Sequence, residues 1–198
     1  MDKNAGLGRP REFALDDAAR DAMEVFRDRG YEGASLPDLI AGTGLSRGSL
    51  YKAFGDKKGL LLAALDRYMS EGLVRTAQQL AQAGPARAAI RDALLRHAAE
   101  SSGGAGRRGC LVVAMAAEQA AHDPEIAART RAMFARLQRL YAAAIVRGQA
   151  GGEFPERDAQ AMARVLVCQI QGMRVLGKTG VAEAEMVEMV DNALRILD

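Results

Sequence analysis

Apolar residues recur every three to four positions along almost the whole chain, and no stretch alternates apolar and polar residues over the length of a strand. This spacing indicates helices that each bury one face. The composition agrees with it, because 49% of the residues are hydrophobic whereas 5% are aromatic and Trp is absent. The core must therefore be built from Ala, Leu, Val and Met, which favour helices over strands. We expect an all-α fold of about nine helices.

The 198 residues are enough for one large domain or for a small domain joined to a larger one. The expected helices are short near the N-terminus and longer after it. We place a small three-helix domain at residues 1–55 and a larger helical domain at residues 56–198. The fourth helix is expected to continue straight out of the small domain, so no linker separates the two.

The small domain carries clear helix start and stop signals. A first helix is predicted from Leu15 to Arg29, with Gly30 placed to end it. Ser35 and Asp38 form an acidic variant of the capping box at the start of a second, short helix. Ser46 is the predicted N-cap of a third. Two short helices joined by a glycine-containing turn indicate a helix-turn-helix.

The third helix has a polar face suited to DNA. If Leu50, Ala53 and Phe54 point inward, the opposite face presents Arg47, Gly48, Ser49, Tyr51 and Lys52. Arginine can bind guanine through two hydrogen bonds, and hydroxyl and ammonium groups can bind base edges or phosphates. Gly48 has two explanations: it allows close approach to the DNA, or it is tolerated near a helix start on a solvated basic face.

Basic residues flank this face. The formal net charge of +2 does not by itself indicate a nucleic-acid partner, but Thr43–Lys58 contains four basic residues and one acidic residue. Lys57 and Lys58 begin the fourth helix, where the helix dipole favours a phosphate. Arg9 and Arg11, in "GRPR", are expected in a short extended arm that enters a minor groove.

Residues 8–68 resemble the DNA-binding domain of the TetR/AcrR family of transcriptional regulators, in the "GRPR" arm, in "AMEVFRDRGYEGASLPDLIAGTGLS" and in "GSLYKAFGDKKGLL". The resemblance implies a homodimer that binds a palindromic operator, usually represses, and releases DNA when a small molecule occupies its C-terminal domain. It also implies the contact residues. Phosphate contacts fall on Ser35, Tyr51 and Lys57, and the base-reading region on Thr43, Arg47, Gly48, Ser49 and Lys52.

The larger domain must supply dimerisation and any ligand site. The last two helices, predicted at Asp158–Lys178 and Ala182–Leu197, are apolar around much of their circumference. We expect them to pair with a second copy as a four-helix bundle. The alternative is that both helices form an intramolecular core.

A pocket for an inducer is expected among the helices of this domain, with mostly apolar walls and scattered polar groups. Most of its candidate residues would also serve as plain core. The candidates are Tyr68, Met69, His97, Met115, Glu118, Met133, Phe134, Leu137, Tyr141, Gln169 and Met173. The sequence does not identify the inducer.

Cys110 follows Arg107 and Arg108 at a predicted helix start, where cations and the helix N-terminus favour the reactive thiolate. It is either a redox or electrophile sensor or an inert core residue. Its surroundings, "RGCLVVAMAAEQAAHDPEI", resemble those in family members that sense electrophiles or oxidants. Cys168, within an apolar helix, is expected to be inert.

The sequence lacks the motifs of several other function classes. It has no close pair of metal ligands, no phosphate-binding glycine loop and no nucleophile elbow, so we expect no metal, no cofactor and no enzymatic activity. Without a secretory signal or a membrane-spanning apolar run, a soluble cytoplasmic protein is expected. A DNA-binding factor without ligand control is the second function class.

Overall fold

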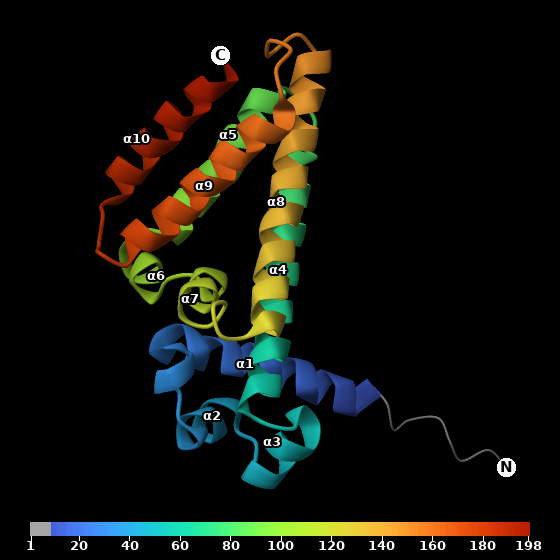
Figure 1. The fold of residues 1–198 in the computed structure, drawn as a ribbon, viewed down its shortest axis with the longest axis vertical. Helices are drawn as coiled ribbons and strands as arrows, with labels where there is room; N and C mark the ends of the chain where they lie inside the picture. Colours follow the sequence, from blue (N-terminus) through green and yellow to red (C-terminus); the bar gives the residue numbers. More distant parts are fainter. Residues whose placement is uncertain (1–8) are drawn as a thin grey trace, which may run out of the picture. The chain divides into compact units, whose positions relative to one another are not determined.

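The computed structural model describes residues 9–198, with side chains from residue 15 onward. All regular structure in this range is helical, which confirms the all-α fold (Figure 1). Contacts divide the chain into two units, Met1–Met69 and Ser70–Asp198. The division falls within helix α4 (Lys57–Leu80), beyond the boundary expected at residues 55 and 56. The first half of α4 is thus packed with the N-terminal helices.

The first unit consists of three helices and the start of α4. Its helices are α1 (Arg9–Gly33), α2 (Leu36–Thr43) and α3 (Arg47–Phe54). The core of this unit combines residues from all four helices, among them the completely buried Phe26, Leu39, Leu50 and Leu60. Burying one anchor from each helix fixes α3 against the others and leaves its opposite side to solvent.

The predicted caps of the short helices are confirmed. The Ser35 hydroxyl accepts a hydrogen bond from the Asp38 amide at 3.3 Å, and the Asp38 carboxylate accepts one from the Ser35 amide at 3.0 Å. Gly44 ends α2 in the left-handed conformation, with φ of 66°. Gly30 has non-helical angles, with φ of 71°, so it interrupts α1 at the residue where the helix was expected to stop.

The second unit contains the rest of α4 and the remaining helices. These are α5 (Ala86–Glu100), α6 (Gly103–Arg108), α7 (Leu111–Glu118), α8 (Pro124–Ala150), α9 (Ala159–Gly177), α10 (Glu183–Ala193) and a closing 3-10 turn (Leu194–Leu197). Helices α8 and α9 run side by side, and α10 lies along α5 (Figure 1). No helix in the described range is both long enough and apolar enough to cross a lipid bilayer.

Helix α6 is the element that the sequence analysis missed. It lies in "SSGGAGRRG", which the glycines and serines suggest is an irregular polar break. Gly106 of this helix is needed for packing, because a β-carbon at this position would lie 2.2 Å from the Ser101 carbonyl oxygen. A β-carbon on Gly177 of α9 would lie 2.1 Å from the same oxygen. The missing side chains therefore let the ends of α5, α6 and α9 meet backbone to backbone.

The last helix does not offer a free apolar face. Its apolar residues Met186 and Val190, with Leu194 and Leu197 of the 3-10 turn, are buried in the core of the same chain. This face of α10 packs against α5 of the same chain, and the pairing of the last two helices with a second copy stays a prediction.

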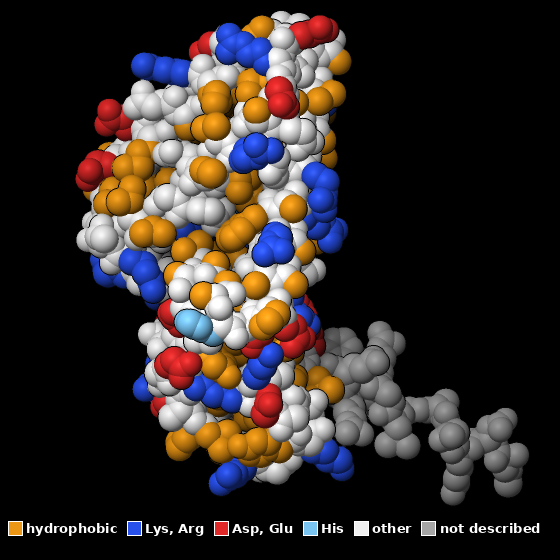
Figure 2. Space-filling view, in the orientation of Figure 1, with side chains coloured by type: hydrophobic (Ala, Val, Ile, Leu, Met, Phe, Trp, Pro, Cys, Tyr) orange, Lys and Arg blue, Asp and Glu red, His pale blue; other side chains and the backbone are white. Residues whose placement is uncertain are grey.

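Helix α9 keeps one exposed apolar stripe. Val165, Cys168, Gly172 and Val175 are exposed and follow one another at intervals of three or four residues, and the exposed Leu176 adjoins Val175. Val146 of the neighbouring α8 is also exposed. Figure 2 shows apolar side chains over this part of the second unit. Within the second unit, α8 and α9 therefore carry most of the exposed large apolar side chains.

Candidate nucleic-acid interface

Helix α3 is held by a cap at its start and by one buried anchor. The Ser46 hydroxyl accepts a hydrogen bond from the Ser49 amide at 3.2 Å and donates one to the Ser49 hydroxyl at 2.9 Å. Leu50 is fully buried. The residues facing away from it are exposed, as the sequence predicted: Arg47, Gly48, Ser49, Tyr51 and Lys52.

The Arg47 guanidinium lies over the ring of Tyr51, with its central carbon 5.6 Å from the ring centroid. This distance is within the range of cation–π contacts. Both side chains remain exposed, with Tyr51 at 40%. The pair therefore projects a cation and a hydroxyl from the same side of the helix.

Gly48 leaves open space beside the helix. A β-carbon at this position would meet no atom within 4 Å, and its φ is outside the positive range. Neither crowding nor a left-handed backbone requires a glycine here, so the reason for it is not found within the chain.

Ser35 and Thr43 are both engaged in local hydrogen bonds. The Ser35 hydroxyl donates to Asp38 at 2.6 Å, and this bond is the main cause of the lowered pKa of the Asp38 carboxyl. The Thr43 hydroxyl donates to the Leu39 carbonyl oxygen at 2.7 Å. The Thr43 proton is therefore already used within α2 and the residue is half-buried, whereas Ser35 is exposed at the start of α2.

Lys57 begins α4, as predicted, and its ammonium lies 4.6 Å from the centroid of the Tyr31 ring. Tyr31 fixes the lysine at a helix N-terminus, where the dipole already favours a phosphate. The Gly59 amide donates to the Asp56 carboxylate at 2.7 Å, which caps the same turn. No local signal in the sequence indicated Tyr31 as the partner of this lysine.

The arm residues Arg9 and Arg11 are placed differently from the prediction. Helix α1 begins at Arg9, so the backbone of both residues is helical rather than extended. Their side chains lie outside the described part of the chain.

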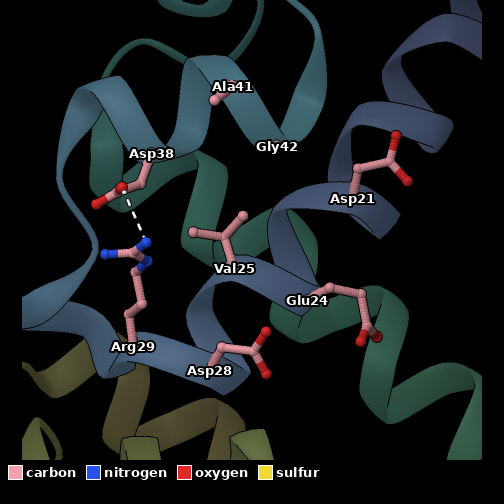
Figure 3. A pocket seen from close by; sticks show the side chains of 8 residues that line it. All are labelled: Asp21, Glu24, Val25, Asp28, Arg29, Asp38, Ala41 and Gly42. Carbon is pink, nitrogen blue, oxygen red and sulfur yellow. Dashed lines mark ion pairs between the residues drawn. The ribbon is translucent and has the colours of Figure 1, made fainter.

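A pocket of about 380 Å³ lies between α1 and α2 (Figure 3). Four of its lining residues are acidic, and Arg29 pairs with one of them, Asp38, at 3.3 Å. The acidic residues are Asp21, Glu24, Asp28 and Asp38. This negative charge repels phosphates, so the groove between α1 and α2 is unsuited to DNA.

The inducer-pocket candidates are divided between the two units. Tyr68 and Met69 belong to the first unit, and the other nine residues to the second. Three candidates are part of the buried core, namely Leu137, Tyr141 and Met173. Met115 and His97 are also buried, whereas Met133, Phe134 and Gln169 are half-buried and Glu118 is exposed. The role of these residues in binding an inducer stays a prediction.

Three charged residues that were not predicted as site residues lie beside His97. Glu100 of α5 bridges Arg96 on its own helix, at 2.8 Å, and Arg174 on α9. The pair Arg96–Glu100 has i,i+4 spacing, which was a readable signal. Arg174, in contrast, lies in an apolar stretch of the sequence, where no spacing signal indicates its partner.

The two cysteines differ in exposure. Cys110 is the N-cap of α7, which confirms its predicted place at a helix start. It is also buried. Cys168 is exposed on α9, and its expected inertness stays a prediction. Across residues 15–198, the structure contains no group of three His, Cys, Asp or Glu residues that could hold a metal ion.

Two family models match the chain. Residues 20–64 match "Bacterial regulatory proteins, tetR family", and residues 86–190 match "Transcriptional regulator LmrA/YxaF-like, C-terminal domain". The chain belongs to the TetR family. It is accordingly a DNA-binding transcriptional regulator and not an enzyme.

Similar TetR family proteins align over nearly their full length. The uncharacterized regulator YezE of Bacillus subtilis is 29% identical over 97% of this chain and 100% of its own. The repressor ComR of Escherichia coli is 29% identical over 96% of this chain and 91% of its own. A solved structure of a cysteine-substituted CifR, a TetR family regulator complexed with 26-base-pair operator DNA, has a TM-score of 0.83 at 30% identity, covering 92% of this chain and 96% of CifR.

Proposed function

We propose that this protein is a cytoplasmic homodimeric repressor that binds a palindromic operator and is released by a small molecule. The observation that carries the proposal is the exposed polar face of α3, with Arg47, Ser49, Tyr51 and Lys52 around Gly48. This face has the size and chemistry of a helix that enters the major groove. The name of ComR as a repressor and the operator complex of CifR support the same role.

The apolar stripe on α9 supports the homodimer. It combines Val165, Val175 and Leu176 with the small residues Cys168 and Gly172. Small residues allow two helices to approach closely, and a two-fold axis brings the same stripe from each copy together. Two helices from each copy, α8 and α9, would form a four-helix bundle.

Val175→Asp is expected to separate the dimer, because it places a charge in the middle of this apolar contact. Val74→Asp is the matched control, since Val74 of α4 is 51% exposed and Val175 is 54% exposed. Sedimentation at micromolar concentration should show a monomer for the first variant and a dimer for the second. A native protein that sediments as a monomer and binds one half-site tightly would contradict the proposal.

Arg47→Ala and Lys57→Ala are expected to weaken operator binding in different ways. Arg47→Ala should cost about 1–3 kcal/mol and relax the preference at one base position, because the guanidinium reads a base. Lys57→Ala should weaken binding to all sequences alike and reduce the salt slope by about 1, because the ammonium binds a phosphate. Titrations at several salt concentrations measure both. A changed sequence preference in Lys57→Ala, with an unaltered salt slope, would refute this docking.

Gly48→Ala is expected to raise fold stability and lower operator affinity. Alanine is the better helix former by up to about 1 kcal/mol, and the open space beside Gly48 accepts the methyl group without a clash. The same methyl group would stand between α3 and the DNA. Thermal melts and operator titrations on this variant test the two effects separately, and unchanged DNA affinity in a stabilised variant would reject the close-approach explanation.

Adding candidate small molecules to the operator complex tests ligand-controlled release against two alternatives. In the first alternative, oxidation or alkylation of Cys110 releases the DNA. The similarity to CifR, whose structure was solved with its cysteines substituted, supports this alternative. In the second, the protein binds DNA without any effector. Footprinting on DNA around the gene supplies the operator for these experiments.

A further inference from the structure

One face of the second unit separates acidic, apolar and basic side chains from one another. Helices α10, α9 and α8 form this face, in that order (Figure 1). Figure 2 shows Asp and Glu side chains along α10, apolar side chains over α9, and Lys and Arg side chains over α8. The separation begins in the sequence, because α10 contains acidic residues and no basic one, whereas α9 contains arginines and no acidic residue.

The basic edge of this face lies where α8 and α9 meet, and we define it by the exposed Arg139 and Arg164. The side chain of Gln138 on α8 donates a hydrogen bond to that of Gln160 on α9 at 3.1 Å. Arg139 comes directly after the first residue of this pair, and Arg164 lies one helical turn after the second. Within residues 15–198, neither arginine forms an ion pair.

The acidic edge lies on α10, and we define it by the exposed Glu185 and Glu188. Both carboxylates are also without an ion pair in the described part of the chain. Asp191 of the same helix differs from them, because it pairs with Arg91 of α5 at 2.9 Å. The charge that α10 leaves unbalanced is therefore negative and includes Glu185 and Glu188.

The apolar stripe of α9 lies between these two edges. Val165 is 48% exposed and Val175 is 54% exposed. An apolar centre with a charged rim is the usual composition of a protein–protein interface. Because the two edges carry opposite charges, a surface that covers this face must carry the same charges in the reverse order.

A second copy of the chain meets this requirement in one orientation and not in another. A two-fold axis parallel to α9 places the acidic edge of each copy over the basic edge of the other, so the favourable contacts occur twice. A two-fold axis that runs across α9 places acidic edge on acidic edge and basic edge on basic edge. Like charges opposed across an interface are unfavourable, so the charges favour the parallel axis.

We propose that a second copy docks on this face about an axis parallel to α9, with Arg139 and Arg164 of each copy paired to Glu185 and Glu188 of the other. The inference rests on the homodimer proposed above and adds the orientation of the two copies. The two α9 stripes meet at the axis, and α10 of each copy lies along α8 of the other. The charged edges thus select both the orientation of the dimer and a partner with the same order of charges.

The test reverses each edge in the full-length protein. One double variant is Arg139→Glu with Arg164→Glu, and the other is Glu185→Arg with Glu188→Arg. Each variant alone should dimerise about 100-fold more weakly than the native protein, because like charges then meet at both edges. An equimolar mixture of the two should dimerise like the native protein, and native mass spectrometry should show the mass of the mixed dimer.

Two controls accompany these variants. Arg107→Glu reverses an exposed arginine of α6, outside the face, and should leave the dimer as strong as in the native protein. Recovery of the dimer on mixing shows that both double variants are folded, since an unfolded chain regains no partner. Sedimentation over a range of concentrations measures all of these dimers.

Two results would overturn the proposal. The first is native dimerisation by each double variant alone, and the second is a preference of the Arg139→Glu, Arg164→Glu variant for the native protein, which an axis across α9 predicts. If Val175→Asp separates the copies while both charge reversals leave them paired, the homodimer stands and the orientation proposed here fails. A native protein that stays monomeric would contradict the homodimer itself.

Discussion

Glu100→Gln is expected to lower the free energy of unfolding by about 3 kcal/mol, the lower end of the loss found when one partner of a buried ion pair is removed. The substitution keeps the size of the side chain but removes the carboxylate charge that pairs with both Arg96 and Arg174. The lower end applies because 33% of the Glu100 side chain is exposed and is screened by water. Urea unfolding at pH 7 measures the loss.

Glu125→Gln is the matched control for this change. Glu125 also pairs with an arginine at i,i+4, Arg129 at 2.9 Å, but the pair lies at the surface. Its loss should cost at most about 0.5 kcal/mol. Equal losses of unfolding free energy in the two variants would show that the partly buried position of Glu100 does not strengthen its ion pairs.

The same carboxylate predicts an acid limb in the stability profile. Burial opposes ionisation of Glu100, but Arg174 and Arg96 outweigh it and lower its pKa from 4.5 to about 2. Because the folded pKa is depressed, the stabilisation is fully present above about pH 4.5 and is lost as the pH falls toward 2. In Glu100→Gln this part of the pH dependence should be absent, and an unchanged acid limb would contradict the assignment.

Gly59→Ala is expected to destabilise the first unit by about 1–3 kcal/mol and to abolish tight operator binding. An added β-carbon would lie 1.9 Å from the carbonyl oxygen of Phe54, a backbone atom that no side-chain rotation can move. The turn between α3 and α4 must shift to make room. This shift would also disturb the hydrogen bond from the Gly59 amide to Asp56 and displace Lys57.

Gly48→Ala again serves as a comparison, because both glycines lie in helices of the same unit and only Gly59 is crowded. Thermal melts should move in opposite directions for the two variants. A Gly59→Ala protein with native stability would contradict the close packing of Gly59 against the Phe54 carbonyl oxygen in the turn between α3 and α4.

The sequence predicted the elements whose signals are local. Ser35, Asp38, Ser46 and the left-handed Gly44 each act within a few residues, so the helix-turn-helix and its exposed face could be predicted without tertiary contacts. The same is true of the helix predicted to begin at Asp158, because Asp158 is the N-cap of α9.

The misses concern features decided by distant parts of the chain. Whether an apolar helix faces a partner or its own core depends on what covers it, and α5 covers α10 while one stripe of α9 stays bare. Helix α6 forms because Gly106 and Gly177 pack against the same carbonyl, from positions far apart in the sequence. Arg174 of α9 forms an ion pair with Glu100 of α5, and the periodicity of either helix cannot predict a contact between the two.

The contact between Arg47 and Tyr51 has a consequence for how DNA is searched. The guanidinium rests on a ring of its own helix. If Arg47 binds a base as proposed, it must leave that ring and lose an attraction of about 0.5–1 kcal/mol. We expect off-target sequences not to compensate for this loss, so that the arginine stays folded back while the protein slides along the DNA backbone. We expect the stacking of Arg47 on Tyr51 to speed the movement of the protein along DNA and to limit the contact between Arg47 and a base to the correct operator.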